Sequence, residues 1–325
     1  MVAVPQKGPW LIATRRSELA KAQARQVAAA LTAATGRPAE LVPMATTGDE
    51  HPDRAIEAFD TKGLFVDHTR KAVLAGDCHM VVHSYKDLPT EASPGLVVTA
   101  VPERADPRDA LVSAAGWRLS DLPRDRPIVI GTSSARRRSQ IERRRRDVLV
   151  QPIRGNLTTR LRKVSDGELD AVVVATAGLL RQKPDVSGLT AVPLEHGEML
   201  HAPAQGALAV ECRVDDDITR VALMQIDHGP SRTEVAAERE LLAMLEGGCT
   251  APIGAHAELR TSTNGDQRLV LLGLVADPSG TRMYRASHEA AHDQPERLGR
   301  TMAATLLEAG GEAILRDLRA QETGA

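Results

Sequence analysis

The sequence predicts an α/β protein of two or three domains. Short apolar runs rich in β-branched residues alternate with amphipathic segments, which is the pattern of strands joined by helices. A chain of 325 residues is also longer than one core of ordinary size requires. The unbroken valine run at 172–174 further favours a parallel strand that is covered on both faces.

Local signals place the elements in order through the first half of the chain. Ser17 begins a helix that stops near Gly36 and Pro38, after a first strand at 11–14. A stretch rich in proline and charge at 102–108 is a candidate crossover. The other strands are predicted at 41–42, 80–82, 128–130, 148–150 and 171–175, and the other helices at 64–74, 134–145 and 156–164.

The last third of the chain carries turn and capping signals. A strand is predicted at 207–210, and the acidic triplet at 215–217 indicates a surface turn. Ser231 and Glu234 form a capping box that predicts the start of a helix. The polar triplet at 264–266 predicts a hairpin between strands at 255–259 and 269–275. A final helix at 296–318 should break near its two adjacent glycines.

The composition excludes several classes of function. A formal net charge of -2 offers no overall basic field for nucleic acid, and 2% aromatic residues leave few platforms for base stacking. No stretch approaches the roughly 18 apolar residues of a membrane span, and the first ten residues lack a signal-peptide pattern. Three cysteines at unrelated spacings suit a reducing cytoplasm, so we expect a cytoplasmic enzyme.

Three strand-to-helix turns carry arginine. They hold Ser134 with Arg136 and Arg137, Arg154 with Arg160, and Arg15 with Ser17. Helix N-termini and guanidinium groups both bind anions, so three such turns suggest one ligand with several carboxylates or phosphates. The alternative for 131–138 is a capped surface helix with solvated arginines, and the run at 143–146 is interpreted as an exposed basic helix end.

Two further features could carry chemistry. Lys86 and Asp87 follow a strand end, where an acid beside a lysine suits acid–base work, although a surface ion pair is the alternative. Cys249 follows two glycines on a loop, which favours an accessible thiol available for covalent attachment. Cys78 and Cys212 lie in or beside strands and are expected to be inert. His79 and His83 lack a third ligand, so no metal site is expected.

Short segments distributed along nearly the whole chain form a recognisable set. They are IATRRS at 12–17, TGD at 47–49, KGLF at 62–65, VHSYKDLP at 82–89, DPRDA at 106–110, GTSSARR at 131–137, RGN at 154–156, TRL at 159–161, AGL at 177–179, AQGA at 204–207 and GGCTAPIG at 247–254. In this order and spacing, which make coincidence untenable, the chain resembles the hydroxymethylbilane synthase (porphobilinogen deaminase) family.

The resemblance implies three α/β domains. The first two, residues 1–102 plus 203–223 and residues 103–202, would resemble type II periplasmic-binding-protein domains with the active cleft between them. The third, residues 224–325, would be a small sheet with helices and would carry Cys249 on a loop. We expect Phe65 to lie on or beside a lid over the cleft.

The resemblance also implies the reaction and its residues. Four porphobilinogens would be joined into hydroxymethylbilane, for haem biosynthesis, on a dipyrromethane cofactor linked to Cys249 through a thioether. Asp87, beside Lys86, matches the family's catalytic acid. By the same resemblance, one set of residues would hold the cofactor, namely Lys86, Ser134, Arg136, Arg137 and Arg181. A second set would bind substrate, namely Arg15, Ser17, Arg154 and Arg160. The enzyme would be a monomer, with transient hand-over of product to uroporphyrinogen III synthase as a further expectation.

The chain departs from the family pattern at three places. Residues 67–70 (DHTR) replace a Lys-Glu-Leu-Glu segment, Ala58 stands where some relatives carry lysine, and Ala204 replaces a common glycine. A paralogue that has lost activity therefore stays open as an alternative. Two others are a periplasmic-type anion-binding protein and a nucleic-acid binder that uses the arginines of 136–146, which the net charge and the scarcity of aromatic residues disfavour.

Overall fold

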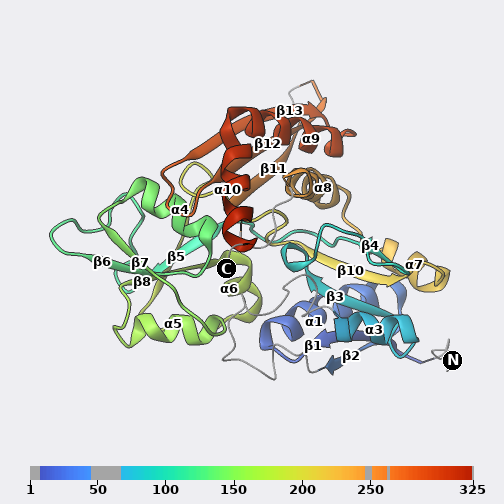
Figure 1. Ribbon diagram of the computed structural model, residues 1–325. Coiled ribbons are helices and arrows are strands. Elements are labelled where there is room, and N and C mark those ends of the chain that lie inside the picture. Colours follow the sequence, from blue (N-terminus) through green and yellow to red (C-terminus); the bar gives the residue numbers. More distant parts are fainter. Residues whose placement is uncertain (1–7, 45–66, 246–250, 262–263, 324–325) are drawn as a thin grey trace. The chain divides into compact units, whose positions relative to one another are not determined.

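The computed structural model describes residues 8–44, 67–245, 251–261 and 264–323. The chain folds as two compact units, Met1–Ala105 with Gly206–Arg232 and Asp106–Gln205 with Thr233–Ala325. The first unit contains one five-stranded sheet, and the second contains a five-stranded and a three-stranded sheet (Figure 1). The α/β class and the third, smaller sheet are thereby confirmed. The three-domain division with the boundaries given above stays a prediction.

The sheet of the first unit has the order β2-β1-β3-β10-β4. The first three of these strands are parallel, and β10 runs antiparallel to both of its neighbours. The chain therefore returns to this sheet from a distant segment to supply its fourth strand. The strands are β1 (Trp10–Arg15), β2 (Ala39–Met44), β3 (Met80–Ser84), β4 (Leu96–Ala100) and β10 (Leu208–Arg213).

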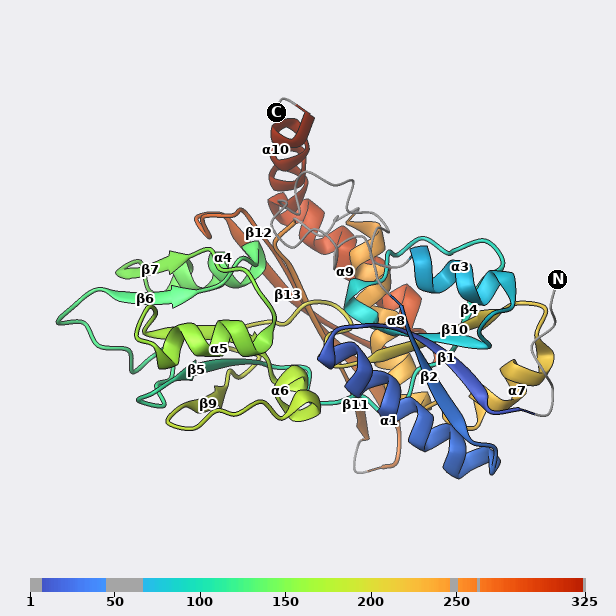
Figure 2. The same cartoon turned by 90° about the horizontal axis from the view of Figure 1, so that it is seen from below.

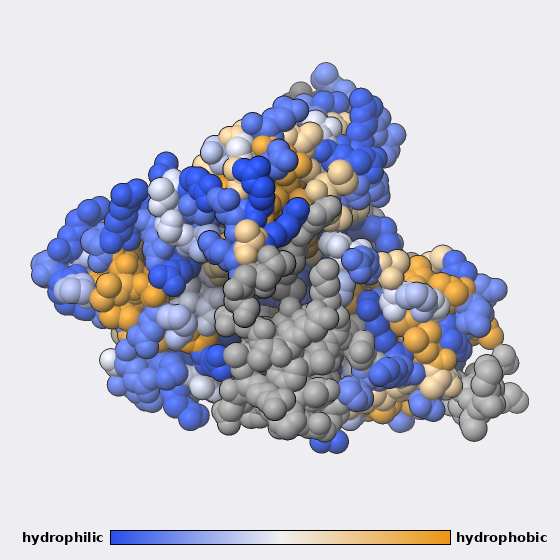
Figure 3. All heavy atoms as spheres, viewed as in Figure 1, coloured by the Kyte–Doolittle hydropathy of each residue, from blue (hydrophilic) through white to orange (hydrophobic). Residues whose placement is uncertain are grey.

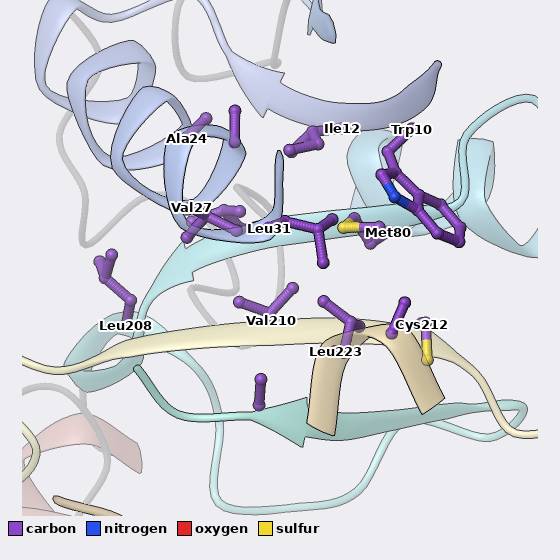
Figure 4. Close-up of a cluster of buried hydrophobic side chains, with 14 residues drawn as sticks. Trp10, Ile12, Ala24, Val27, Leu31, Met80, Leu208, Val210, Cys212 and Leu223 are labelled. Atoms are coloured by element: carbon purple, nitrogen blue, oxygen red, sulfur yellow. The ribbon is translucent and has the colours of Figure 1, made fainter. Parts of the chain in front are cut away.

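Helices cover both faces of this sheet. On one face, α1 (Glu18–Thr35) and α7 (Asp217–Met224) pack on a core in which Val27 and Leu31 point toward Ile12 and Met80 (Figure 4). On the other face, α3 (Asp67–Ala75) packs through Ala72 and Val73. Alternation of strand side chains produces the two cores, because neighbouring residues of a strand point to opposite faces.

The N-terminus of α1 shows how local sequence sets an element. Ser17 is extended and its Oγ accepts a hydrogen bond from the backbone N–H of Ala20, at 3.3 Å. At the other end Gly36 adopts φ 70°, a left-handed conformation that glycine reaches without a steric penalty. Both predicted ends of this helix are confirmed.

The larger sheet of the second unit repeats the same plan. Its order is β7-β6-β8-β5-β9, with three parallel strands followed by β5, which runs antiparallel to both neighbours. The matching strand orders show that the two five-stranded sheets share one topology. The strands are β5 (Asp109–Ser113), β6 (Ile128–Gly131), β7 (Val148–Gln151), β8 (Ala171–Ala175) and β9 (Thr190–Pro193).

Helices also cover both faces of this sheet (Figure 2). On one face α4 (Ala135–Arg144) contributes Ile141 to a core with Leu111 and Val173. On the other face α5 (Leu157–Ser165) and α6 (Thr176–Gln182) pack on Val172 and Val174. The prediction of a strand covered on both faces at 172–174 is confirmed, and its neighbour β5 is antiparallel.

The three-stranded sheet is an antiparallel meander of β11 (Ile253–Thr261), β12 (Gln267–Ala276) and β13 (Met283–Ala291). One face packs on α8 (Gly229–Met244), α9 (Pro295–Leu306) and α10 (Glu312–Thr323). The other face packs Leu272 and Leu274 on Leu200. The predicted hairpin and the predicted break of the last helix are confirmed, the break lying at Gly310 with φ 120°.

One local prediction was incomplete and another was wrong. The acidic triplet lies at the surface with Asp215 in a turn, as predicted, and Asp216 in addition caps α7 by accepting from the N–H of Thr219. Ser231 does not begin a helix, because α8 starts two residues earlier, at Gly229. The Ser231 hydroxyl instead accepts from the backbone N–H of Arg104. Asp216 thus acts as a helix cap, and Ser231 binds the backbone of Arg104 and does not cap α8.

The surface of the described residues carries scattered apolar side chains. On the face in Figure 3, hydrophilic residues dominate and hydrophobic residues form separate patches. Exposed large apolar side chains of this kind are normal for globular proteins. No helix in the described part of the chain combines the length and the apolar character needed to cross a membrane.

Candidate catalytic and carboxylate-binding residues

Four predicted site residues lie at one edge of the first unit's sheet. Arg15 is the last residue of β1, and Ser17 caps the helix that follows. Lys86 and Asp87 lie on the 3-10 turn η2 (Tyr85–Asp87), directly after β3. Because β1 and β3 are adjacent and parallel, their carboxyl ends place these side chains at the same edge.

The turn that carries Asp87 is anchored on both sides. The N–H of Tyr85 donates to the carbonyl of Ala207, and the N–H of Leu88 donates to the carbonyl of Tyr85. Leu88 is buried against Ala209. Asp87 itself is exposed, so a fixed backbone presents its carboxyl group to solvent. This arrangement suits a group that exchanges protons with a bound molecule.

The second unit presents its predicted residues at the equivalent edge of its own sheet. Ser134 follows β6 and caps α4, where its Oγ accepts from the N–H of Arg137. Arg154 follows β7, Arg160 lies on α5, and Arg181 lies on the helix after β8. Because β7, β6 and β8 are adjacent and parallel, their carboxyl ends share one edge.

Arg136 and Arg137 are buried and paired with Asp109. Nη1 of Arg136 lies 2.8 Å from Oδ2 of Asp109, and Nη2 of Arg137 lies 2.7 Å from its Oδ1. Arg136 also donates to the carbonyl of Leu200, and Arg137 donates to that of Val173. The alternative of a surface helix with solvated arginines is therefore wrong for Arg136 and Arg137, since both side chains are less than a tenth exposed.

Asp109 is fully buried and accepts a further hydrogen bond from Nε2 of Gln205, at 2.8 Å. Burial alone would raise the pKa of this carboxyl group, but the charges of Arg136 and Arg137 hold the pKa well below its usual range. Two guanidinium groups against one carboxylate leave one positive charge in the cluster. An anionic ligand at this edge would balance that charge.

Arg160 and Arg181 are half-buried cations. Burial lowers the pKa of Arg181 to about 10. Burial, and then the nearby charge of Arg137, lowers the pKa of Arg160, whose Nε donates to the carbonyl of Gly155. Both groups stay charged at neutral pH. Carboxylates from a ligand would replace the hydration that these cations have lost.

A buried ion network accounts for one departure from the family pattern. Arg70 donates to both carboxylate oxygens of Glu211, at 2.7 and 2.8 Å. Nε2 of His83 lies 3.1 Å from the same carboxylate. Burial opposes this charge, yet its two partners lower the pKa of Glu211 to about 2. Arg70 thus ties α3 to β10, the strand beside the one that leads to Asp87, and His83 lies next to the same carboxylate.

Ala204 and Arg145 also differ from expectation. Ala204 has φ 61°, a left-handed conformation in which glycine avoids the strain of a Cβ atom, so the residue change is not structurally neutral. Arg145 is buried, not exposed, and donates to the carbonyls of Leu122 and Pro123 and to Asp147. Among the arginines of 143–146, only Arg145 contradicts the expectation of an exposed helix end.

The two described cysteines are buried. Burial raises the pKa of the Cys78 thiol to about 11, and burial raises the pKa of Cys212, which also contacts Oγ1 of Thr99. Both are inert core residues, as expected. Three other positions, Cys249, Phe65 and Ala58, lie outside the described residues.

Sequence reasoning missed Asp109 and Glu211 as supporting residues. The available signal was a charged residue inside a strand-like apolar run, since Asp109 opens DALVS and Glu211 interrupts LAVECR. Such residues persist in a buried strand only when a charged partner compensates them. The partners Arg136 and Arg70 lie 27 and 141 residues away in sequence, so the pattern alone could not name them.

Comparison with known proteins decides the family. The family model "Porphobilinogen deaminase, dipyromethane cofactor binding domain" matches residues 10–221, and "Porphobilinogen deaminase, C-terminal domain" matches residues 232–308. The chain belongs to the porphobilinogen deaminase family. Its first matched region, which includes both sets of edge residues, is thus the family's cofactor-binding domain.

Relatives of the same name match nearly end to end. The porphobilinogen deaminase of Nocardia farcinica is 46% identical, with 98% of this chain and 91% of the relative covered. That of Mycobacterium tuberculosis is 45% identical, with 95% and 99% covered. Among solved structures, a substrate binding domain of a putative amino acid ABC transporter from Streptococcus pneumoniae has a TM-score of 0.40 and 11% identity, and covers 67% of this chain and 91% of its own. That similarity is too weak to support any conclusion.

Proposed function

We propose that this chain is a hydroxymethylbilane synthase, a transferase of tetrapyrrole biosynthesis. It condenses four porphobilinogen molecules head to tail, with loss of ammonia, on a dipyrromethane primer. Membership of the porphobilinogen deaminase family over nearly the whole chain supports this reaction. The observation that carries the residue assignments is the gathering of arginines at the carboxyl edge of the second unit's sheet, where Arg136 and Arg137 are buried and Arg160 and Arg181 are half-buried.

These arginines fit the cofactor's chemistry. Each pyrrole unit derived from porphobilinogen carries an acetate and a propionate, and burying carboxylates is costly unless charged donors replace water. The cluster of Arg136, Arg137 and Asp109 carries one net positive charge. Arg181 is a further cation, and burial lowers its pKa to about 10. These three arginines, with Ser134 and Lys86, would hold the dipyrromethane, and Cys249 would bind it covalently.

Arg15, Arg154 and Arg160 would bind the carboxylates of the incoming substrate, with Ser17 as a hydroxyl donor. Ser17 already accepts a hydrogen bond at the start of α1. Its hydroxyl hydrogen can still be donated, because a hydroxyl group combines one donor with two acceptor lone pairs. A helix N-terminus adds a favourable dipole for the same anion.

Asp87 would act on the reacting atoms. When bound, the dipyrromethane supplies the terminal pyrrole carbon to which the substrate is joined. The Asp87 carboxylate would stabilise the positive charge that develops as ammonia leaves the substrate. It would also accept a hydrogen bond from the pyrrole N–H while the new bond forms. Lys86, its neighbour on the same turn, would orient a carboxylate nearby.

The Asp87→Asn variant tests this assignment. Asparagine keeps the size of the side chain but removes its negative charge, so turnover of porphobilinogen should fall about 100-fold or more. The purified variant should still carry the cofactor, detected by intact mass and by Ehrlich's reagent. Turnover close to that of the parent would refute the catalytic role.

The matched control is Asp77→Asn. Asp77 is an exposed acid of the same unit, on the turn after α3. Its substitution should leave turnover and cofactor content unchanged. A comparable loss in both variants would show that the effect of Asp87→Asn is not specific to the site.

We further propose a cytoplasmic monomer that passes hydroxymethylbilane to a uroporphyrinogen III synthase, with Phe65 at a lid over the bound pyrroles. Two buried, unpaired thiols support a reducing compartment. Light scattering during size-exclusion chromatography should give a mass near the 34.8 kDa of one chain. A mass of about 70 kDa would contradict the monomer.

A further inference from the structure

Three histidines meet within the second unit. His196 and His201 lie in the segment after β9, and His256 lies on β11. One ring nitrogen of each lies within 4.8 Å of the other two. The rings of His196 and His256 are stacked, with centroids 3.5 Å apart, and that of His201 stands edge-on to both.

A histidine that binds a metal ion usually donates its other ring N–H to a carbonyl or carboxylate oxygen, and His201 makes such a hydrogen bond. Nδ1 of His201 lies 2.9 Å from the carbonyl oxygen of Ala202. A carbonyl only accepts, so this Nδ1 carries the hydrogen and Nε2 keeps its lone pair. That lone pair faces Nδ1 of His256, at 3.1 Å. Nδ1 of His196 is buried and has no hydrogen-bond partner among the described residues, an arrangement that calls for an explanation.

The backbone around His201 is fixed against β11. The N–H of Ala255 donates to the carbonyl of His201, at 3.0 Å. A Cβ atom at Gly254 would lie 2.9 Å from Cβ of Leu200, so only glycine permits this approach. His256 projects from the face of the sheet that packs on Leu200. The ring of His256 is therefore held toward the segment that carries the other two.

The backbone around His196 is fixed as well. Nη2 of Arg285, on β13, donates to the carbonyl of His196 at 2.8 Å, and Nε of Arg144 donates to that of Glu198. Farther along, Gln140 both donates to the carbonyl and accepts from the N–H of Leu200. Metal sites need ligands on a rigid frame, and this segment is anchored from α4 and β13.

We propose that His196, His201 and His256 bind one divalent transition-metal ion of the zinc class. Three imidazoles with a water molecule in the fourth position form a tetrahedral site, for which ligand nitrogens lie roughly 3.3 Å apart at Zn–N distances of about 2.0–2.1 Å. The 3.1 Å between His201 and His256 is already close to that value. The His196 ring is stacked on that of His256, so it would have to turn out of this stack to direct a nitrogen at the same ion.

Such an ion would tie the segment after β9 to β11. It would bind the folded second unit and not the unfolded chain, so it would raise the stability of that unit by mass action. The donor set of neutral imidazoles suits zinc, copper or nickel and not calcium or magnesium, which prefer oxygen ligands. This inference does not rest on the proposed function, because metal content is measured without turnover.

Zinc titration of the untagged, cofactor-loaded protein tests the proposal. After treatment with a chelator, the parent should bind one equivalent of Zn²⁺ and melt at a higher temperature with it. His201→Asn and His256→Gln should each weaken binding roughly 100-fold, since each removes a ligand. His68→Ala, at an exposed histidine of the first unit, should bind as the parent does.

If the variants fail to fold, a second measurement on the parent still tests the proposal. X-ray absorption at the zinc edge of the loaded parent should show three imidazole nitrogens in a four-coordinate shell. Absence of stoichiometric binding by the parent would overturn the proposal. So would unchanged affinity in both folded variants, or a shell that contains sulfur or mainly oxygen.

Discussion

Asp109 governs the placement of Arg136 and Arg137. Its carboxylate is fully buried and contacts both guanidinium groups and the amide of Gln205. The arginines also bind the carbonyls of Leu200 and Val173, so their positions are set from several sides. A residue with no proposed contact to substrate thus holds two residues that are proposed to touch the cofactor.

Replacing Asp109 with asparagine should destabilise the protein by about 3–5 kcal/mol, because it leaves two buried guanidinium groups without a counter-charge. Chemical unfolding followed by circular dichroism measures the loss. Asp121→Asn, at an exposed carboxyl of the same unit, should change stability by no more than about 0.5 kcal/mol. A loss below about 1 kcal/mol in Asp109→Asn would mean that the cluster does not depend on its carboxylate.

Elements differ in how far the sequence alone predicts them. β8 and α1 were predicted because a valine run and a pair of caps are local signals. β13 was missed, since its residues alternate in burial but include charged and polar side chains, and only pairing with β12 identifies it. β5 was missed because its first residue is an aspartate whose partners lie on a distant helix. The candidate site shows the same difference, because its residues at the strand ends were predicted from local sequence. Asp109 and Glu211, the buried residues that support them, were not.

The break between α9 and α10 depends on a glycine with an unusual backbone conformation. Gly310 has φ 120°, and a Cβ atom there would lie 2.5 Å from Oη of Tyr284. Gly310→Ala should therefore cost about 2–3 kcal/mol, from backbone strain and from displacement of the tyrosine.

Gly167 provides the comparison for Gly310. It also has a positive φ, of 74°, but a Cβ atom there would meet no other atom within 4 Å. Gly167→Ala should thus cost only the backbone strain, about 1 kcal/mol. Equal losses in the two variants, measured by chemical unfolding, would show that Tyr284 adds nothing.

At the scale of the whole molecule, each unit repeats one topology and places polar residues at the carboxyl edge of its sheet. Buried ionisable groups lie elsewhere in the first unit, with His79 at the amino end of β3 and Glu211 within β10. His79 accepts from the N–H of Leu11 through Nδ1, and burial, with the charge of Arg37, lowers its pKa to about 4 from 6.5. Glu211 has its pKa lowered to about 2 from 4.5.

Acid should destabilise the first unit in two stages. His79 is neutral when folded and takes up a proton on unfolding below pH 6.5, so its contribution, on the order of 3 kcal/mol, is present above pH 6.5 and lost as pH falls toward 4. Glu211 is ionised when folded, so its contribution is lost as pH falls from 4.5 toward 2.

Urea unfolding at a series of pH values between about 7.5 and 4 measures the first stage. His79→Gln removes the titrating group, so its stability should vary less over that range than the parent's. A parent whose stability stays constant from pH 6.5 to 4 would contradict the proposed protonation of His79 on unfolding.

Cys249 is proposed to anchor a dipyrromethane on which the chain builds its product. Intact mass of the purified protein, compared with Cys249→Ser, tests it most directly, because a serine hydroxyl cannot form the thioether. The parent should be heavier than its sequence by one dipyrromethane and give a positive Ehrlich reaction, and the variant should have its sequence mass. A parent that stays unmodified after incubation with porphobilinogen, or a variant that carries the same adduct, would contradict it.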